Sequence, residues 1–370
     1  MSSLNVGADR RRFGLLHILF CSAGLALVAA FILSSGSGSR WCMFLPFSFT
    51  GIAVLTNVEA GKNRFGRYKR YGIPEIVGDD GLVIETETME EIDGAIERIL
   101  SRGEHLICLN GGDGTVQRAL TSIMNACGER EDELPVFFPL RGGTMNLLAD
   151  NLGIKGKAPQ LLREAMKTAA FSEELPYVEI PTLRVVREMA GGTEREYGFF
   201  FGSGALYRFH RVYYRDTKGG TLPAVKLVLR CLGEGMVKRG RYRGIFGMTD
   251  LRVSMDDFQM PRESFIIVLA MVFKKMLLTF NPFRDEGEGD FFTLAMGLPL
   301  GKIFTNLHKL FWVRGDEPPF PPDAYYNRRA SRLKLRSGEG YSLDGEIFEL
   351  NEPFDITIDL GPSVKILDIS

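Results

Sequence analysis

The stretch "LICLNGGDGTVQRALTSIMN" (residues 106–125) places three glycines between an apolar run and a segment with helical periodicity. A strand that ends in glycines and continues as a helix leaves backbone N–H groups at the helix N-terminus, where the helix dipole favours phosphate. Asp113 adds a carboxylate suited to a metal ion, a ribose or a proton transfer. No Gly-Lys-Ser/Thr follows, so the pattern differs from a P-loop. A purely structural turn is the competing interpretation.

A second glycine loop, "PLRGGTMNLLADNLGI" (139–154), has the same design, with Asn146 at the expected start of a helix. A third loop, "TNVEAGKN" (56–63), follows another apolar run. Ligands of open α/β sheets bind at the carboxyl ends of the strands. The three loops together therefore predict one convergent nucleotide site.

The chain has 370 residues, which at about 150 residues per domain suggests two folded domains. Four short apolar runs alternate with helical patterns, and they cover residues 51–57, 81–86, 105–110 and 135–140. This alternation predicts a parallel sheet covered by helices over residues 51–175. Beyond residue 175 the segments become β-rich with short turns, which predicts a mostly antiparallel second domain over residues 176–370.

The charge is distributed unevenly, although the formal net charge of −1 gives no global attraction to nucleic acid. Residues 207–243 carry ten Lys/Arg against Asp216 and Glu234, with aromatic residues interleaved. Such a patch fits an anionic membrane surface, an anionic ligand, nucleic acid or a solvated face. Within it, residues 222–243 read as a basic amphipathic helix that either lies in a headgroup layer or covers the core of the second domain. The five cysteines show no disulfide or zinc spacing.

Residues 1–40 form a separate segment that ends in the linker "SSGSGS". Its uncharged run Phe13–Leu33 follows three arginines and is long enough to cross a bilayer. An uncleaved anchor is the preferred interpretation, and a signal peptide is the alternative. The arginines would direct the following domain out of the cytoplasm, where a nucleotide-using enzyme could not work. We therefore expect the protein at the cytoplasmic side of a membrane and leave the orientation of residues 13–33 open.

The motifs "GGDGT", "GGTMN" and the distal "DGE" (344–346) together resemble the diacylglycerol kinase catalytic domain superfamily, which includes sphingosine and ceramide kinases. The resemblance spans roughly residues 51–370. It implies a doubly wound, NAD-kinase-like α/β domain that binds ATP between the glycine loops, followed by an antiparallel β-sandwich domain that receives a lipid. The implied reaction is the Mg²⁺-dependent phosphorylation of a hydroxyl of diacylglycerol or a related lipid.

The resemblance also implies which residues contact the nucleotide. These are Asn57, Gly61, Thr86, Gly112, Gly114, Thr115, Gly143, Thr144 and Asn146. Thr88 competes with Thr86 for its role. The chain departs from the family pattern at Val58, Ala60, Gln117, Arg118, Leu147 and Asp150.

Asp113 and Glu346 are the implied catalytic residues, with Glu346 placed to take the proton from the attacking hydroxyl. A plain hairpin turn would also explain the Asp-Gly pair of "DGE". The acidic stretch "NPFRDEGEGDFF" (281–292) resembles a segment where some relatives bind a structural Mg²⁺, which makes Asp285 and Glu288 the candidate ligands. A solvated loop is the alternative there.

Two other functions stay open. The departures at Gln117, Arg118 and Leu147 suit a catalytically inactive lipid-binding protein of the same fold, and "GGDGT" is also found in kinases of soluble nucleotides. The expected partners are a lipid substrate and a membrane surface, without nucleic acid, and a homodimer is left open. The lipid itself would be selected by scattered apolar positions such as Phe199, Phe200 and Leu206.

Overall fold

The computed structural model describes residues 51–64, 67–79, 81–172, 174–189, 192–217, 220–274, 283, 287–306, 320–321, 324–350 and 352–369. Residues 48–370 form one compact unit, separate from residues 1–47. The predicted apolar segment Phe13–Leu33 lies outside the described residues. Among the described helices, none has the length and apolar character needed to cross a bilayer.

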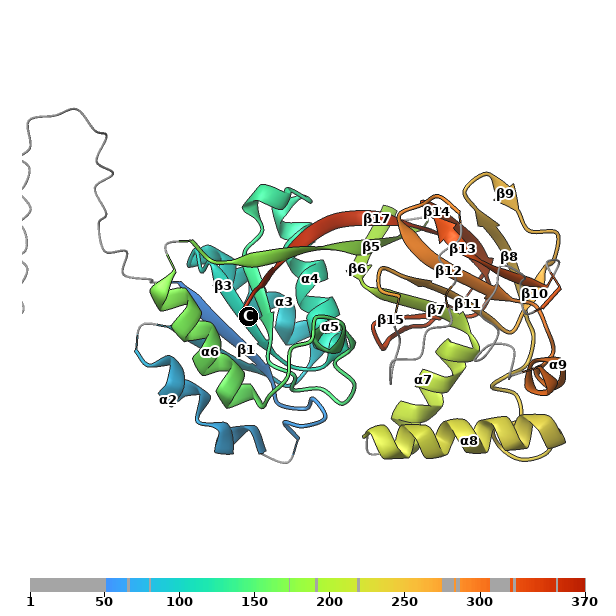
Figure 1. The fold of residues 1–370 in the computed structure, drawn as a ribbon, viewed down its shortest axis with the longest axis horizontal. Helices are drawn as coiled ribbons and strands as arrows, with labels where there is room; N and C mark the ends of the chain where they lie inside the picture. Colours follow the sequence, from blue (N-terminus) through green and yellow to red (C-terminus); the bar gives the residue numbers. More distant parts are fainter. Residues whose placement is uncertain are drawn as a thin grey trace, which may run out of the picture. The chain divides into compact units, whose positions relative to one another are not determined.

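The first part of the described chain is an α/β fold (Figure 1). Its elements are β1 (Ile52–Asn57), η1 (Arg67–Tyr71), α2 (Ile73–Val77), β2 (Leu82–Thr86), α3 (Met89–Ser101), β3 (Leu106–Asn110), α4 (Asp113–Cys127), η2 (Glu131–Glu133), β4 (Val136–Pro139), α5 (Leu147–Asn151) and α6 (Ala158–Phe171). Strands β2, β1, β3 and β4 pair in parallel in that order. All four lie where the apolar runs predict strands.

Helix α3 shows why this part folds as the sequence predicts. Thr88 caps its N-terminus by accepting a hydrogen bond from the Glu91 N–H at 3.3 Å. Its apolar residues recur at helical spacing and are buried: Ile92, Ala95, Ile96 and Ile99. Helix α3 packs on α4, and α2 packs on α6. The helices cover the parallel sheet and close a core with it.

The second part is mainly antiparallel. Its strands are β5 (Tyr177–Met189), β6 (Gly192–Gly198), β7 (Phe200–Gly204), β8 (Thr249–Met255), β9 (Phe258–Gln259), β10 (Ser264–Phe265), β11 (Ile267–Met271), β12 (Phe291–Met296), β13 (Tyr325–Ala330), β14 (Arg332–Ser337), β15 (Tyr341–Leu343), β16 (Glu346–Phe348) and β17 (Phe354–Leu367). The described strands β13, β12, β11, β7, β15 and β16 form one antiparallel sheet in that order. Its inner face packs against residues of β5, β8, β14 and β17 to form a shared core.

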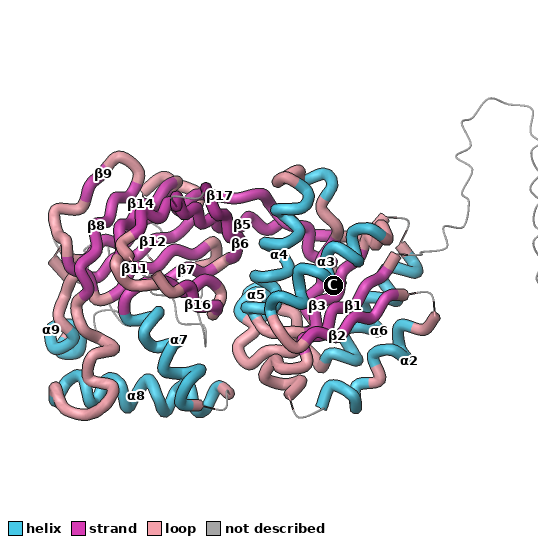
Figure 2. Tube along the Cα trace, turned by 180° about the vertical axis from the view of Figure 1, so that it is seen from behind, coloured by secondary structure: helices cyan, strands magenta, loops and turns pink. Residues whose placement is uncertain are grey.

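The sequence misleads at the C-terminus, where 354–360 and 364–370 read as two strands. They form one long strand, β17, with an irregularity between Gly361 and Ser363. The C-terminal end of β17 pairs in parallel with β4, through Lys365 and Val136. Strand β5 lies beside β17 (Figure 2) and pairs with it in the antiparallel direction. The parallel sheet therefore continues into the second part, a long-range pairing that alternation of residue type cannot reveal. The change from α/β elements to mainly antiparallel strands lies between the end of α6 at Phe171 and the start of β5 at Tyr177, and a domain boundary near residue 175 stays a prediction.

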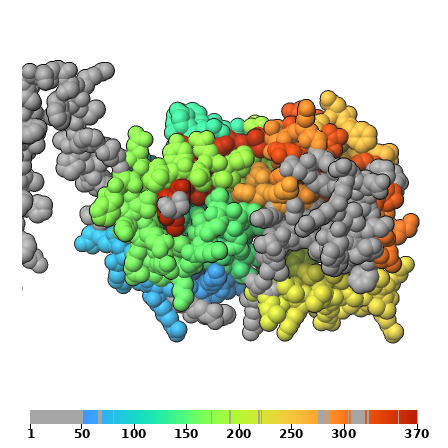
Figure 3. Space-filling model, viewed as in Figure 1, coloured from blue at the N-terminus to red at the C-terminus, as the bar shows by residue number. Residues whose placement is uncertain are grey.

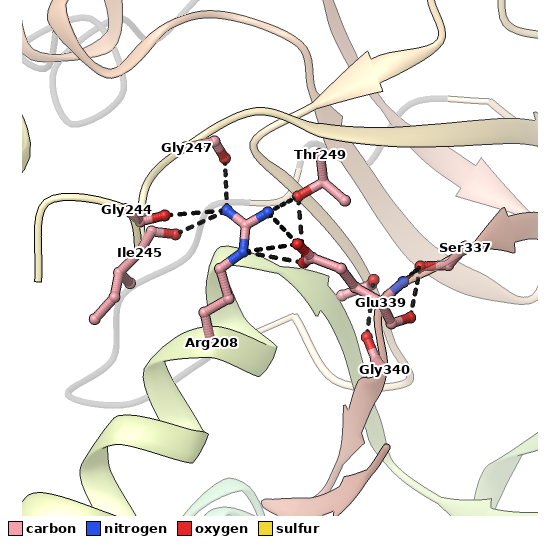
Figure 4. Close-up of polar contacts among 9 residues, drawn as sticks. Arg208, Gly244, Ile245, Gly247, Thr249, Ser337, Glu339 and Gly340 are labelled. Atoms are coloured by element: carbon pink, nitrogen blue, oxygen red, sulfur yellow. Dashed lines mark hydrogen bonds and ion pairs between the residues drawn. The ribbon is translucent and has the colours of Figure 1, made fainter. Parts of the chain in front are cut away.

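Among the described residues of the second part, three helices accompany the strands: α7 (Ala205–Asp216), α8 (Thr221–Val237) and α9 (Leu300–Thr305). Arg208 of α7 fixes the segment after α8 (Figure 4). Its guanidinium donates to the carbonyls of Gly244 at 3.2 Å and Gly247 at 2.9 Å, and it pairs with Glu339 at 2.7 Å. Because one planar group ties three segments together, α7 and the end of the α8 connection are held in place.

Candidate active site

The predicted glycine loops converge at the carboxyl ends of the parallel strands. A Cβ added to Gly143 would lie 2.2 Å from the Cα of Gly112, so the loops that follow β3 and β4 touch through their backbones. Neither glycine has a positive φ, so close approach rather than unusual backbone geometry requires glycine here. Gly112 precedes α4 without a side-chain cap, which leaves N–H groups of the first turn for a ligand.

The loop after β1 joins the other two through Asn57, Gly61 and Thr144. The Asn57 amide donates to Thr115 Oγ1 at 3.0 Å, and a Cβ on Gly61 would meet Thr144 Oγ1 at 2.3 Å. Asn146 shapes the loop rather than the cavity wall, because its side chain accepts from the Gly143 N–H at 3.0 Å and donates to the Gly143 carbonyl at 2.9 Å. The structure thus gathers the predicted residues of all three loops.

Thr86 ends β2 and is buried, and its Oγ1 has no hydrogen-bond partner among the described residues. Thr86 does not line the polar cavity described below, whereas the nearby Glu87 and Met89 do. Its competitor Thr88 serves as the N-cap of α3. The structure therefore gives Thr88 a structural role and leaves the Thr86 hydroxyl as an unsatisfied polar group near the loops.

Asp113 begins α4, and its half-buried carboxylate faces the start of α5. Burial raises the pKa of Asp113 from 3.8 to about 6, while hydrogen bonds from the backbone of Leu147, Leu148 and Asn146 oppose part of that rise. The group therefore changes charge near neutral pH. A carboxylate of this kind suits either metal binding or proton transfer.

Glu346 comes from the other part of the fold and reaches Gly114. A Cβ added to Gly114 would lie 1.8 Å from Glu346 Oε1, so only glycine leaves room for this carboxylate. Asp344 and Gly345 form the turn of the β15–β16 hairpin with φ of 49° and 91°, as the turn interpretation of "DGE" expects, and the catalytic role of Glu346 stays a prediction. Burial raises the pKa of Glu346, and the nearby charge of Arg118 lowers it.

Asp344 is a site residue that the sequence interpretation missed. Its two carboxylate oxygens accept from the backbone N–H groups of Phe199 at 2.8 Å and Phe200 at 2.9 Å. Burial raises its pKa well above the ordinary value, and the charges of Asp113 and Glu346 raise it further. Asp344 thus holds the β15–β16 hairpin against the start of β7 and fixes the position of Glu346 at the end of the turn. Its place in "DGE" was the available signal, but only the Glu was assigned a role.

Gln117 and Arg118, which depart from the family pattern, take part in a closed polar network. The Gln117 amide donates to Thr121 Oγ1 and to Glu196 Oε2, both at 3.0 Å. Arg118 pairs with Asp93 of α3. Glu196 lies on β6, and no local sequence pattern marks it. These departures therefore have partners of their own within this chain.

A polar cavity of about 280 Å³ lies where the loops and the hairpin meet. Its acidic lining residues are Glu59, Glu87, Asp113, Asp344 and Glu346, and Arg64 also lines it. Tyr214 of α7 borders it as well, and burial together with the charges of Glu346 and Asp113 raises the pKa of its hydroxyl. The cavity is rich in carboxylates, so a bound anion would need a cation beside it.

An apolar cavity of about 350 Å³ adjoins the polar one. Its lining residues are Asp113, Met145, Leu147, Phe200, Ala205, Leu206, Phe209, His210, Val228, Phe246, Ile267, Asp344 and Gly345. Of the predicted apolar positions, Phe200 and Leu206 line it, whereas Phe199 belongs to the core of the α/β part. Burial lowers the pKa of His210 to about 4, so this ring stays neutral at physiological pH, with Nδ1 2.7 Å from Ser342 Oγ.

Of the two candidate metal ligands, Glu288 alone is described, and it lines neither cavity. Asp285 lies outside the described residues, and Glu288 is an exposed residue before β12. Across the described part of the chain, no group of three or more His, Cys, Asp or Glu residues is arranged to hold a metal ion. The structural Mg²⁺ at 281–292 stays a prediction.

Comparison with known proteins shows what the α/β part is similar to. The diacylglycerol kinase catalytic domain family matches residues 51–173. This segment contains all three glycine loops, and the resemblance inferred from the motifs is confirmed over it. The comparison with curated proteins gives no match.

Solved structures extend the likeness to the whole fold. A structure from Bacillus anthracis str. Sterne, provisionally assigned as a diacylglycerol kinase, is 15% identical with a TM-score of 0.59, covering 86% of this chain and 97% of its own. A diacylglycerol kinase structure from the same organism is 12% identical with a TM-score of 0.54 and the same coverage. At such identities the likeness concerns the fold. It confirms the predicted class, an α/β part with a parallel sheet followed by an antiparallel β part.

Proposed function

We propose that the protein is a lipid kinase that transfers a phosphoryl group from ATP·Mg²⁺ to a hydroxyl of diacylglycerol or a related lipid. One observation carries this proposal: the polar and apolar cavities share Asp113, Met145 and Asp344. A lipid whose chains occupy the apolar cavity would present its polar end at these residues. Phosphoryl transfer depends mainly on such positioning and on charge stabilisation.

The residues of the polar cavity fit a nucleotide with a divalent cation. The touching backbones of Gly112 and Gly143 form a cradle that any side chain would fill, and Thr86 Oγ1 is a buried hydroxyl without a partner among the described residues. Asp113 would hold the Mg²⁺ from the protein side. When bound, Mg²⁺ would neutralise phosphate charge in a cavity that is otherwise dominated by carboxylates.

Glu346 is the proposed general base. Its carboxylate enters from the hairpin, lies against Gly114 and is fixed by the Asp344 hydrogen bonds to Phe199 and Phe200. Burial raises its pKa toward the range where a carboxylate accepts a proton effectively. Asp344 acts as a positioning residue, because both of its oxygens are occupied by backbone N–H groups.

The proposal is tested by incubating the full chain with γ-labelled ATP, Mg²⁺ and one of three acceptors: diacylglycerol, a total lipid extract or NAD. We expect label in a phosphorylated lipid and none in a sample of the Asp113→Ala variant. Lipid binding without label transfer would instead favour the inactive lipid-binding protein. Label transfer to NAD but to no lipid would favour the kinase of a soluble nucleotide.

The hydrogen-bonded network around Gln117 argues against a catalytically inactive protein, since the residues there that depart from the family pattern have hydrogen-bond partners within this chain.

A further inference from the structure

Helix α8 has two opposite faces, and the inner one is buried against the rest of the fold. Ala224, Leu227 and Cys231 lie on its inner face and are buried against Tyr213, Tyr242 and Ile245. At 3.6 residues per turn these three helix positions fall on one side. The inner face thus anchors α8 to α7 and to the segment that follows α8.

The outer face of α8 is apolar and exposed. Leu222, Leu229 and Val237 have exposed fractions of 65%, 64% and 72%, and Met236 is also exposed. A spacing of seven or eight residues places them on one stripe, opposite the buried positions. In the space-filling view α8 lies along the lower edge of the second part (Figure 3). Exposed apolar residues gathered in one stripe indicate a surface for another molecule.

The charges around this stripe are positive. Lys226 and Arg230 lie between its apolar residues, and both are exposed. The two acidic residues of this region each pair with cations, Asp216 with Arg215 and Arg241, and Glu234 with Arg230, so Lys226 carries the positive charge of the stripe that no described carboxylate offsets. Exposed cations continue past the helix end at Lys238, Arg239 and Arg243. Apolar side chains set among cations match an anionic lipid surface better than another protein core.

The same helix also borders the apolar cavity. Val228 of α8 lines that cavity together with Leu206 and Phe209 of α7. Because Arg208 holds the segment after α8, the stripe keeps a fixed position beside the cavity. A molecule seated on the outer face would therefore lie close to the wall of the proposed lipid site.

We propose that the outer face of α8, defined by Leu222, Lys226, Leu229, Arg230, Met236 and Val237, docks on an anionic bilayer surface. Its apolar residues enter the boundary between headgroups and acyl chains, and its cations contact lipid phosphates. The inference deepens the proposed function and rests on it for the source of the lipid. Docking brings the apolar cavity to the bilayer, so that a substrate molecule need not cross water.

The test uses a local probe, because residues 13–33 of the full chain can themselves bind lipid. The Leu229→Trp variant is reconstituted into vesicles of phosphatidylcholine with or without phosphatidylglycerol, and lipids brominated on their acyl chains serve as quenchers. Phe171→Trp is the matched control, since Phe171 is 83% exposed at the end of α6, away from the stripe. The background from Trp41 and Trp312 is subtracted with the unmodified chain.

We expect bromolipid to quench the added fluorescence of Leu229→Trp but not that of Phe171→Trp, and to quench it more strongly with phosphatidylglycerol present. Adding Lys226→Glu should weaken docking at least about fivefold, because each cation near an anionic surface contributes to binding. Equal quenching of both probes, or quenching of neither, overturns the proposal. So does the finding that Leu229→Glu separates a dimer without any lipid quenching.

An activity comparison separates this inference from the proposed function. Leu229→Glu should lower phosphorylation of vesicle-borne diacylglycerol by about tenfold, because one buried leucine is lost from the docked state. It should leave phosphorylation of a water-soluble, short-chain diacylglycerol unchanged, and Phe171→Glu should change neither. Quenching without kinase activity refutes only the proposed function. Kinase activity without quenching refutes only the docking.

Discussion

The polar cavity and the apolar cavity share three residues and are otherwise built in opposite ways. The polar cavity lies where glycine loops approach so closely that Gly112 and Gly143 touch, and carboxylates line it as well. The apolar cavity is formed by side chains from β7, α7, α8 and β11, such as Phe200, Phe209 and Val228. The polar cavity depends on a few glycines in short motifs, whereas the apolar cavity tolerates many combinations of apolar residues. The proposed nucleotide site can therefore be recognised from sequence, whereas the proposed lipid site beside it cannot.

The contrast is sharpest at Asp113 and Asp344, which border both cavities. Burial raises the pKa of both carboxyls, and the charge of Asp113 raises the pKa of Asp344 further. A carboxylate between a polar cavity and an apolar one is costly to ionise, and a cation would offset that cost. An ionised carboxylate is thus least stable at the boundary between the two cavities. A reaction that neutralises this negative charge is favoured most at the same place.

The largest expected effect comes from removing the carboxylate of Asp113. Asp113→Ala should reduce turnover by roughly 10³-fold, as expected when a preorganised electrostatic group is lost. The variant should still fold, because the ionised Asp113 is a liability at neutral pH. Its folded pKa of about 6 exceeds the ordinary 3.8, so its contribution to stability is lost as pH rises from about 4 through 6.

Initial rates and thermal unfolding of Asp113→Ala and Asp113→Asn check this prediction. We expect Asp113→Asn to be inactive and, above about pH 6, at least as stable as the unmodified chain. A folded variant with a normal rate would remove Asp113 from the reaction and leave the two cavities without a shared catalytic group.

The next effect concerns Glu346. Glu346→Gln should keep ATP affinity and lower turnover by roughly 10²-fold, toward the small end of general-base effects because phosphoryl transfer needs little early deprotonation. Gly114→Ala should have a similar effect, since its Cβ would occupy the space of the Glu346 carboxylate. The double variant should be little worse than either single variant. Additive losses would show that Gly114 and Glu346 act separately, and lost ATP affinity would make Glu346 a nucleotide residue.

Sequence patterns predict the parts of this fold in which neighbours along the chain are also neighbours in space. The four parallel strands, α3 and the loops at Gly112 and Gly143 follow from local alternation and glycine placement. The pairing of β17 with β4 does not, because nothing in residues 354–367 specifies a partner so much earlier in the chain. Glu196 and Asp344 were missed for the same reason: their roles arise from partners on distant elements.

The apolar cavity can be tested without touching the nucleotide loops. Val228→Trp should fill part of the cavity and raise the KM for a long-chain diacylglycerol by about tenfold, with ATP affinity unchanged. The matched control is Phe171→Trp, which adds the same side chain at an exposed position at the end of α6. Short-chain substrates should be affected less. If both variants behave alike, or if ATP affinity falls instead, the apolar cavity is not the lipid site.

The smallest expected effect is a shift in the pH profile of the Arg118→Gln variant. It shows whether protonation of Glu346 or of Asp113 causes the loss of activity at low pH. Arg118 lies one helical turn beyond Gly114, on the face of α4 that Glu346 approaches, and its charge lowers the pKa of Glu346. Removing that charge in Arg118→Gln should raise this pKa, so that the base is protonated, and activity lost, at a higher pH. Because Arg118 also pairs with Asp93, the shift should be less than about one pH unit. The pH profile of kcat/KM measures it, and Arg118→Lys, which keeps the charge, should leave the profile nearly in place. Asp113 has its own pKa of about 6, but Arg118 is not among the groups that shift it. An acid limb that does not move in Arg118→Gln would therefore belong to Asp113, and the proton acceptor would lie on the boundary between the two cavities rather than on the hairpin.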